Sequence, residues 1–331
     1  MRFIVTGGAG FIGSNVIHAL NERGIEDIIV VDNLEKPGKF SNLSKLKISD
    51  FFAKEDFLER FSSGYFGTVE AIFHEGACSD TMEHNGRYVM DNNFRYSKNI
   101  LDTCVANKTR LLYASSAAVY GASGVFMPSP VNETPLNVYG YSKLLFDNVV
   151  RRCFLRKDHA QIAGFRYFNV YGPGEDHKGR MASVAWHHMN QLREAGHVRL
   201  FGAYDNYEAG QQSRDFVYVD DVVRVNMWFL DHPGVSGVFN LGTGRAEPFN
   251  AVAHSAVNSW RAGLGLAALS LKEQIAAGLV RYIDFPDNLK GKYQSFTQAD
   301  ISALRQAGYD SEFQTVAEGV VKYAQFRNAS Q

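Results

Sequence analysis

Residues 1–20 read MRFIVTGGAGFIGSNVIHAL: an apolar run, a glycine-rich turn and an amphipathic helical pattern, in that order. This order is the context that a dinucleotide-binding fingerprint needs. Gly7 permits the tight turn, Gly10 leaves room for a pyrophosphate, and Gly13 lets the helix lie close to the strand. Amides at the helix start would face the phosphates, where the helix dipole favours negative charge. A ligand-free glycine turn is the alternative, and the acid about 20 residues further on, Asp32, argues against it.

Strand and helix patterns alternate through the rest of the first half. Further apolar runs typical of strands lie at Asp27–Val31, Ala71–His74, Leu111–Ala114 and Ile162–Phe168. Helical patterns stand between them, notably at Gly86–Ala106 and Tyr141–Cys153. Strands that do not alternate polar and apolar residues, and that are separated by helices, predict a parallel sheet covered on both faces.

The pattern changes after Tyr171–Gly174. The following elements are expected: a helix at Met181–Glu194, a strand at Val198–Phe201, a polar loop at Ala203–Ser213, a helix at Val222–Leu230, a strand at Val238–Leu241, a helix at Phe249–Arg261, a strand at Val280–Phe285 and a last helix at Val316–Arg327. Residues 263–278 give no clear pattern. We therefore predict an α/β fold, a doubly wound parallel Rossmann sheet with a second, smaller α/β substrate domain made from discontinuous C-terminal segments.

The domain boundaries can be predicted only coarsely. We expect the Rossmann domain to comprise residues 1–172 with about 215–245 and 298–315. The substrate domain would then take about 173–214, 246–297 and the C-terminal helix.

Composition argues against several classes of partner. With 34 Lys and Arg against 35 Asp and Glu, no overall field favours nucleic acid or a membrane surface. No apolar run approaches the ~20 residues of a membrane-spanning helix, and the N-terminal run is too strand-like for a signal peptide. Cys78, Cys104 and Cys153 fit neither a disulfide framework nor a metal site, so we expect no metal and a reducing, cytoplasmic location.

The corner after the second strand gives conflicting signals on the cofactor. Asp32 there would bind the adenosine ribose hydroxyls and repel a 2′-phosphate, which favours NAD. Asn33 follows at once, and Lys39 and Lys54 could bind a 2′-phosphate or could simply be solvated surface lysines. From the residues alone, NAD and NADP both remain open.

A constellation for proton transfer stands further on. Tyr139 and Lys143 share one face of a helix, and Ser116 ends the strand before it. The ammonium of Lys143 would favour the phenolate of Tyr139, which could then take a proton from a hydroxyl group held by Ser116. Ala117 and Ala118, which follow Ser116, can neither give nor take a proton.

These motifs resemble the extended branch of the short-chain dehydrogenase/reductase superfamily, whose members mostly act on nucleotide sugars. Within it, the chain resembles the ADP-glycero-manno-heptose 6-epimerases of lipopolysaccharide core synthesis. The resemblance rests on these segments, in order: HEGACSD, MDNN, SSAAVYG, LNVYGYSK, FRYFNVYGP, HKGRMASVA, RDFVYVDDV, FNLGTGRA and LKGKYQSFTQADI. It covers nearly the whole chain and is weakest at Ala203–Ser213 and at about Asn258–Gly278.

The resemblance implies a reaction. Hydride would leave C6 of the heptose, giving a 6-ketone, and would return to the other face after rotation about one C–C bond. Two acid/base groups are then needed, by resemblance Tyr139 and Lys178. Without the resemblance, Lys178 in its glycine-flanked loop would rather be a phosphate contact or a solvent-exposed lysine.

The resemblance also implies two sets of binding residues. The cofactor set is Gly7, Gly10, Phe11, Ile12, Gly13, Asp32, Asn33, Lys39, Lys54, Glu75, Gly76, Ala77, Cys78, Ser79, Asn92, Lys143, Val170 and Lys178. The substrate set is Asn169, Arg180, His187, Phe201, Gly202, Ala203, Tyr204, Arg214 and Tyr293. Each of three residues also has a purely structural alternative. Cys78 could simply line the pocket, His187 could be a core histidine, and Arg214 could form a local salt bridge with Asp215.

The resemblance finally implies NADP as the cofactor, with NAD as the alternative, and a homo-oligomer. Two other functions remain open. One is epimerisation at C4 of a UDP-hexose, which needs Tyr139 and Lys143 but not Lys178. The other is a non-catalytic protein that senses its cofactor, and such a protein could dispense with the tyrosine and the lysine.

Overall fold

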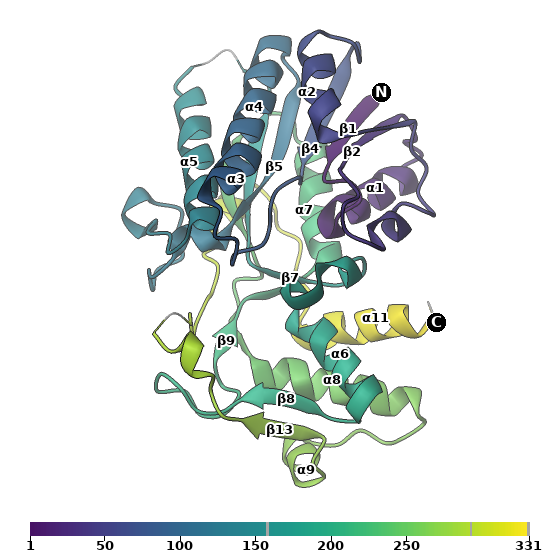
Figure 1. Ribbon diagram of the computed structural model, residues 1–331, viewed down its shortest axis with the longest axis vertical. Helices are drawn as coiled ribbons and strands as arrows, with labels where there is room; N and C mark the ends of the chain where they lie inside the picture. Colours follow the sequence, from purple (N-terminus) through teal and green to yellow (C-terminus); the bar gives the residue numbers. More distant parts are fainter. Residues whose placement is uncertain (157–158, 292, 330–331) are drawn as a thin grey trace. The chain divides into compact units, whose positions relative to one another are not determined.

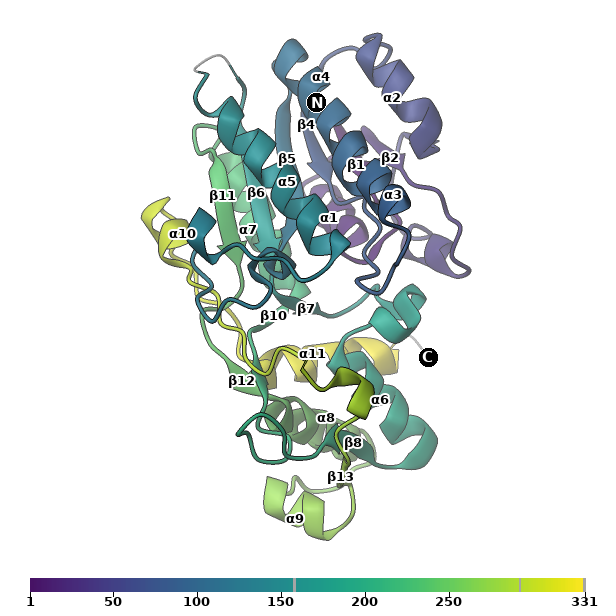
Figure 2. The same cartoon turned by 60° about the vertical axis from the view of Figure 1, so that its left-hand side comes forward.

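The computed structural model describes residues 1–156, 159–291 and 293–329 (Figures 1 and 2). The chain divides into two compact units. Unit 1 comprises Met1–Tyr167, Val222–Leu241 and Asp300–Asp310. Unit 2 comprises Phe168–Asp221, Gly242–Ala299 and Ser311–Gln331.

Unit 1 is built on a seven-stranded sheet in which every neighbouring pair is parallel. Its strands are β1 (Arg2–Thr6), β2 (Ile28–Val31), β3 (Asp50–Phe52), β4 (Val69–His74), β5 (Arg110–Ser116), β6 (Ile162–Tyr167) and β11 (Gly237–Leu241). They lie in the order β11-β6-β5-β4-β1-β2-β3, so the order reverses between β1 and β4. Ligands of such sheets bind at this reversal, beyond the carboxyl ends of the strands.

Helices cover both faces of this sheet. They are α1 (Phe11–Glu22), α2 (Lys54–Ser62), α3 (Gly86–Val89), α4 (Tyr96–Asn107), α5 (Val138–Cys153), α7 (Val219–Asp231) and α10 (Ser302–Gln306). Apolar side chains of α2, α4 and α5 form one core with the facing side chains of the strands. On the other face, Phe229 of α7 packs on Phe165 and Phe239.

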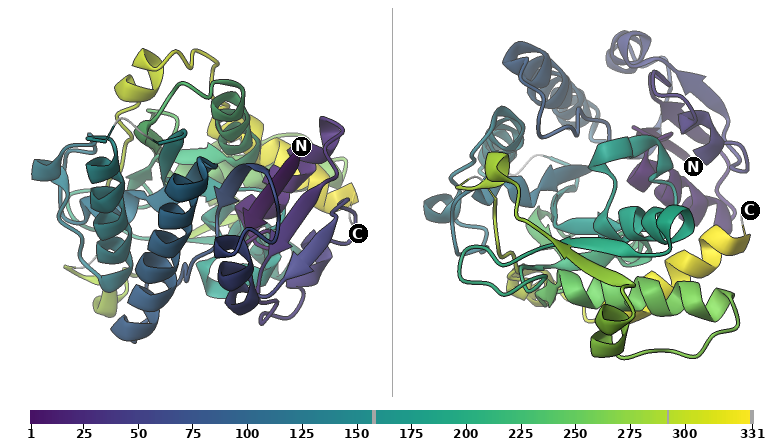
Figure 3. Two further views of the ribbon diagram at one scale, coloured as in Figure 1. Left: turned by 90° about the horizontal axis from the view of Figure 1, so that it is seen from above. Right: turned by 60° about the horizontal axis from the view of Figure 1, so that its bottom comes forward.

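Unit 2 holds three two-stranded sheets and a group of helices (Figure 3, right). β7 (Asn169–Tyr171) and β10 (Phe216–Tyr218) are parallel, as are β8 (Val198–Phe201) and β13 (Val280–Ile283), whereas β9 (Ser213–Arg214) and β12 (Glu247–Pro248) are antiparallel. The helices are α6 (Val184–Ala195), α8 (Phe249–Gly263), α9 (Leu271–Ala276) and α11 (Val316–Ala329). Helix α8 lies against α6 and α11.

The predicted doubly wound parallel sheet is confirmed, with differences in detail. The unit boundary follows Tyr167 rather than residue 172, because β7 pairs with β10 and not with a strand of the large sheet. The sequence did not predict β3 and α2, and the expected helix at Gly86–Ala106 is interrupted by a π-helical turn at Met90–Arg95. In the stretch without a clear pattern, a capping box formed by Ser270 and Glu273 starts α9.

Helix α5 is attached to the sheet by charges that are buried together. Asp147 accepts hydrogen bonds from Tyr113 Oη, Ser115 Oγ and Arg166 Nε, each at 2.9 Å. Arg166 Nη1 also lies 2.7 Å from Glu133 Oε1, and both side chains of the Asp147–Arg166 pair are 0% exposed. A buried ion pair contributes little relative to an apolar pair of the same shape, but removing one partner leaves an uncompensated charge.

We therefore predict that Asp147→Ala lowers the free energy of unfolding by about 3–5 kcal/mol, measured by urea denaturation followed by circular dichroism. The matched control is Asp102→Ala on α4, which breaks an exposed i,i+4 pair with Lys98 and should cost at most about 1 kcal/mol. Equal effects of the two substitutions would contradict the role of the buried pair.

Candidate active site

The glycine turn after β1 has the geometry of a phosphate-binding site. Gly7 has φ +65°, and a Cβ at Gly13 would lie 2.4 Å from the Gly7 carbonyl oxygen, so a side chain at either position is strained or excluded. Helix α1 begins at Phe11 with Gly10 as its N-cap, and no acidic residue stands in its first turn. First-turn amides lack partners within a helix. The turn therefore fits the pyrophosphate of a dinucleotide, and Gly7, Gly10, Phe11, Ile12 and Gly13 all lie in it.

The corner after β2 brings Asp32 and Lys39 together. Asp32 is buried, and Lys39 Nζ lies 2.5 Å from its Oδ1. The carboxylate also accepts hydrogen bonds from the amides of Ala9, Asn33 and Leu34. The charge of Asp32 is thus largely balanced, which removes much of the repulsion toward a phosphate that the sequence suggested.

The segment after β4 lies against the glycine turn. A Cβ on Gly7 would lie 2.7 Å from Gly76 Cα, so Gly76 and Gly7 are close neighbours. Asn93, in the π-helical turn, fixes the segment because its side chain bonds both the amide and the carbonyl of Cys78, at 2.8 and 3.0 Å. Ala77 and Ser79 lie exposed beside Cys78. Asn92, next in the same turn, accepts from Lys54 Nζ at 2.6 Å.

Ser116, Tyr139 and Lys143 come from β5 and α5. The side chain of Asn137 caps α5 by accepting from the Gly140 amide, which starts the helix just before Tyr139. The Tyr139 hydroxyl and the Ser116 side chain are hydrogen-bonded. Lys143 is 3% exposed, and its Nζ donates to the Ala114 carbonyl at 2.8 Å. The structure thus brings the predicted proton-transfer residues together in unit 1.

The charges of this group differ from the expectation. Burial raises the pKa of Tyr139, and the hydrogen bond with Ser116 only partly offsets this. Burial also lowers the pKa of Lys143 to about 8, against the opposing effect of Glu75 and Asp147. The sequence predicted a tyrosine made acidic by its lysine, but it could not show that Lys143 is buried and Tyr139 half-buried.

The sequence reasoning missed two residues of this edge, Tyr167 and Asn226. The Tyr167 hydroxyl donates to Glu75 Oε1 at 2.9 Å and accepts from Asn226 Nδ2 at 3.2 Å. Tyr167 ends β6, and Asn226 is a polar residue on the otherwise apolar face of α7 that also contains Phe229. An asparagine on such a face is the signal that could have pointed to a buried polar network.

In unit 2, Lys178 lies in the short 3₁₀ helix at Asp176–Met181. Glu175 immediately precedes this helix and is fully buried. Its carboxylate accepts hydrogen bonds from Ser183 Oγ, the Ser183 amide and the Gly172 amide at 2.7, 2.6 and 3.3 Å. Burial raises the pKa of Glu175, whereas the charge of Lys178 lowers it. Glu175, which the sequence reasoning did not single out, thus fixes both ends of the loop that contains Lys178.

A second group in unit 2 is aromatic and cationic. The guanidinium of Arg214 lies 4.9 Å from the ring centre of Tyr293, with which its side chain is also hydrogen-bonded, and 5.6 Å from that of Phe249. Phe201 packs edge-on to Tyr293, and Tyr204 stacks on Phe285 with centroids 3.9 Å apart. Gly202 and Ala203 connect Phe201 to Tyr204. Planar rings around a guanidinium suit a base and a phosphate.

The other predicted substrate residues of unit 2 are more scattered. Arg180 is exposed in the 3₁₀ helix, and the ring of His187 on α6 contacts its carbonyl oxygen at 3.4 Å. Of the two adjacent histidines on α6, His188 is buried and His187 is half-buried. Asn169 is exposed and Val170 half-buried on β7. Arg214 has no salt bridge to Asp215 among the described contacts; Asp215 instead accepts from Thr243, Gly244 and Ala299.

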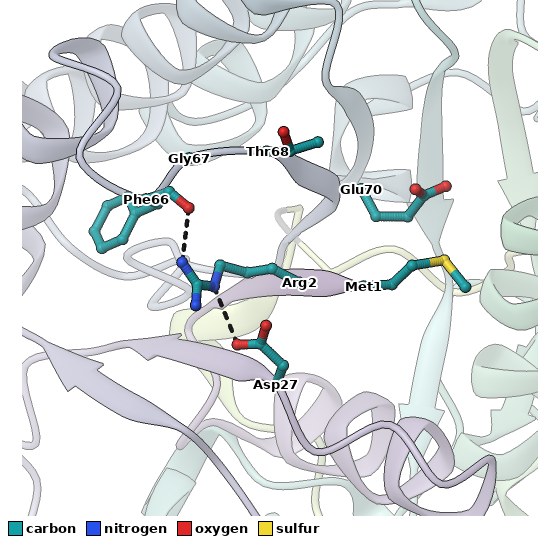
Figure 4. A pocket seen from close by; sticks show the side chains of 7 residues that line it. All are labelled: Met1, Arg2, Asp27, Phe66, Gly67, Thr68 and Glu70. Atoms are coloured by element: carbon teal, nitrogen blue, oxygen red, sulfur yellow. Dashed lines mark hydrogen bonds and ion pairs between the residues drawn. The ribbon is translucent and has the colours of Figure 1, made fainter.

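A cavity of about 370 Å³ opens at the opposite, amino-terminal edge of the sheet (Figure 4). Its lining residues are Met1, Arg2, Asp27, Phe66, Gly67, Thr68 and Glu70. Arg2 is bonded to Asp27 and to the Phe66 carbonyl, so its charge is already satisfied within the wall. None of these lining residues is among the residues predicted for the site.

Two further properties concern the residues that the structure describes. No group of three or more His, Cys, Asp or Glu side chains among them could hold a metal ion. None of their helices has both the length and the apolar character needed to cross a membrane.

Comparison with known proteins agrees with the fold. Residues 3–242 match the NAD dependent epimerase/dehydratase family. The chain is similar to ADP-L-glycero-D-manno-heptose-6-epimerase from Helicobacter pylori, with a TM-score of 0.80 and 30% identity over 99% of this chain and 96% of that one. UDP-N-acetylglucosamine 4-epimerase from Methanobrevibacter ruminantium gives a TM-score of 0.79 and 21% identity over 100% and 99% of the two chains. UDP-glucose 4-epimerase from Thermotoga maritima gives 0.77 and 26% over 100% of each. The chain belongs to the NAD dependent epimerase/dehydratase family.

Proposed function

We propose that this protein is an isomerase that inverts C6 of the heptose in ADP-D-glycero-D-manno-heptose, giving ADP-L-glycero-D-manno-heptose. The observation that carries the proposal is the loop around Lys178, which a buried carboxylate fixes at both ends. At a carbon outside the sugar ring the hydroxyl is presented in two orientations, which calls for two acid/base groups, and we assign Lys178 as the second. The 30% identity with the Helicobacter pylori 6-epimerase along nearly the whole chain supports the same substrate.

The chemistry follows from the proton carriers. A bound nicotinamide cofactor supplies reversible hydride exchange with C6. Tyr139 takes the proton of the C6 hydroxyl on one face, Ser116 holds that oxygen, and the ammonium of Lys143 stabilises the phenolate. C6 lies outside the sugar ring, so rotation about one C–C bond turns the other face of the ketone forward. Lys178 then gives a proton to the oxygen on that face.

The end of β5 favours epimerisation over dehydration. Ala117 and Ala118 follow Ser116 in a short 3₁₀ helix, Ala117–Tyr120, and neither can give or take a proton. Elimination of water needs an acid at the leaving hydroxyl and a base at the adjacent carbon. Within the family, this chain therefore has the residues for transient oxidation and re-reduction.

The second candidate is epimerisation at C4 of a UDP-hexose. The TM-scores of 0.79 and 0.77 with two UDP-sugar 4-epimerases favour it, at 21% and 26% identity. That reaction uses the residues of unit 1 and has no need of Lys178. A non-catalytic sensing role is less compatible with the structure, because Ser116, Tyr139 and Lys143 are all present and in register on β5 and α5.

We propose NADP as the cofactor, bound by the residues at the carboxyl edge of the large sheet, with NAD as the alternative. Lys39 supports NADP because it balances the charge of Asp32 at 2.5 Å. A cytoplasmic location, a homo-oligomer and a place in lipopolysaccharide core synthesis follow from the same family resemblance and stay predictions. The roles of the other predicted site residues also stay predictions, as does the assignment of the cofactor to unit 1 and of the substrate to unit 2.

The decisive experiment incubates the protein with ADP-D-glycero-D-manno-heptose and follows the stereochemistry at C6 by NMR. We expect inversion, and we expect Lys178→Met to slow it by about 100-fold or more, the usual contribution of a general acid or base. Lys272→Met, which removes an exposed lysine on α9 of the same unit, is the control and should keep the full rate. An unchanged rate in Lys178→Met contradicts the two-base assignment, and inversion of a UDP-hexose at C4 instead supports the second candidate.

Cofactor choice gives an independent prediction. The dissociation constant should be lower for NADP than for NAD, measured by titration of the apoprotein. Lys39→Met should raise the constant for NADP by about tenfold or more, because one charged hydrogen bond is lost and the charge of Asp32 is uncovered. Lys45→Met, an exposed lysine a few residues further on, should change neither constant. Tighter binding of NAD than of NADP by the wild-type protein would overturn the choice.

A further inference from the structure

The carboxyl group of Glu75 points into the protein at the edge where strand order reverses. Its amide bonds the Thr6 carbonyl at 3.0 Å, which joins the end of β4 to the end of β1. Oε1 accepts from Tyr167, which Asn226 holds in turn. Oε2 is buried and has no hydrogen-bond partner among the described residues. A buried carboxylate oxygen without a partner is costly, so a functional reason for it is worth seeking.

In the register of β4 and β5, His74 pairs with Tyr113, so Glu75 comes level with Ala114, whose carbonyl accepts a hydrogen bond from Lys143 Nζ. Lys143 is therefore the charged neighbour of this carboxyl. The ammonium of Lys143 acts on Glu75, and the carboxylate of Glu75 in turn opposes the loss of charge at Lys143. The other groups that act on Lys143 are Asp147 and Cys78. The carboxylate of Asp147 already accepts hydrogen bonds from Arg166, Tyr113 and Ser115. Burial raises the pKa of the Cys78 thiol, which keeps the thiol neutral. Glu75 is therefore the carboxylate whose charge can vary beside the lysine.

We propose that Glu75 is a positioning residue that controls the charge of Lys143, through the electrostatic effect of the Glu75 carboxylate on the Lys143 ammonium. The proposal rests on the function proposed above, in which a charged Lys143 supports the Tyr139 phenolate. Tyr167 and Asn226 hold the carboxyl in place from β6 and α7. Glu75 thus acts on the reaction through Lys143, and not by touching the reacting carbon.

The signs of the charges set the pH window of this pair. Burial raises the pKa of Glu75 to about 7, although the hydrogen bond from Tyr167 and the charge of Lys143 lower it. Burial lowers the pKa of Lys143 to about 8. Glu75 is therefore negative above about 7, and Lys143 is positive below about 8. Loss of the negative charge at Glu75 would lower the pKa of Lys143 further, so the lysine would become neutral at a lower pH.

A purely structural role for Glu75 and a role in setting the charge of Lys143 lead to different results on replacement of Glu75. If Glu75 only packed against β1 and β6, its replacement would lower stability or weaken cofactor binding, and the pH at which activity is lost would stay where it is. If Glu75 sets the charge of Lys143, the alkaline limb of the kcat profile must move. The pH profile is therefore the readout that a structural role leaves unchanged.

The kinetic experiment compares Glu75→Gln with Glu70→Gln in the cofactor-bound protein. Glu70 lies near the amino end of β4, the strand that Glu75 follows, and it pairs with Arg110 at 3.1 Å. We expect Glu75→Gln to move the alkaline limb of kcat to lower pH by about one unit, the usual effect of one nearby opposite charge, and Glu70→Gln to leave it in place. Tyr167→Phe should raise the pKa of Glu75 and move the limb in the same direction by less. An unmoved limb in Glu75→Gln overturns the proposal.

A second measurement does not depend on the substrate. In protein labelled with ¹³C at glutamate carboxyls, one signal should titrate near pH 7, vanish in Glu75→Gln and move to higher pH in Lys143→Met. The absence of such a signal, or a signal that Lys143→Met leaves unmoved, overturns the charge pair. If the wild-type protein leaves ADP-heptose unchanged, the proposed function fails, and this titration still decides whether the pair exists.

Discussion

The candidate site depends first on the buried pair of Asp147 and Arg166. Helix α5 provides both Tyr139 and Lys143, whereas Ser116 comes from β5 and Tyr167 from β6. Asp147 is on the same helix and is bonded to side chains of both strands, so the register of the helix on the sheet is fixed by charge as well as by packing. Apolar packing alone would tolerate small sliding of the helix, but a buried carboxylate with three donors does not. The proton-transfer group therefore keeps its geometry because a structural ion pair lies two helical turns away from Tyr139.

Much of the fold and part of the site could be predicted because their signals are local. Gly7, Gly10 and Gly13 lie within seven residues, and backbone crowding around Gly7 explains each of them. Tyr139 and Lys143 are four residues apart on a helix, a spacing that places them on one face in any context. Whether each of these residues binds or reacts as proposed is still a prediction. Their positions, however, follow from short-range rules.

What the sequence could not provide is the set of contacts between distant segments. Glu75, Tyr167 and Asn226 are far apart along the chain and meet only because β4, β6 and α7 converge at one edge. Lys39 reaches Asp32 through a loop whose course no pattern predicts. Burial, too, depends on tertiary structure, so the raised pKa of Tyr139 and the lowered pKa of Lys143 could not be read from residue types. The boundary between the units differs from the predicted one for the same reason, because the sequence of the three-residue strand β7 does not indicate that it pairs with β10.

The edge of the sheet has to meet two opposing demands. Proton transfer to and from a sugar hydroxyl works best away from bulk water, because fixed charges act more strongly there. Exclusion of water also disfavours the phenolate of Tyr139 and the ammonium of Lys143, which are the two charged forms that the reaction needs. The hydrogen bond between Ser116 and Tyr139, and the one that Lys143 donates to the Ala114 carbonyl, offset only part of this cost. A second buried carboxyl close to the lysine restores the charge balance without admitting water. Glu75 occupies that position. Its effect on the charge of Lys143 gives a physical reason for an acid next to Gly76, the residue that lies against Gly7.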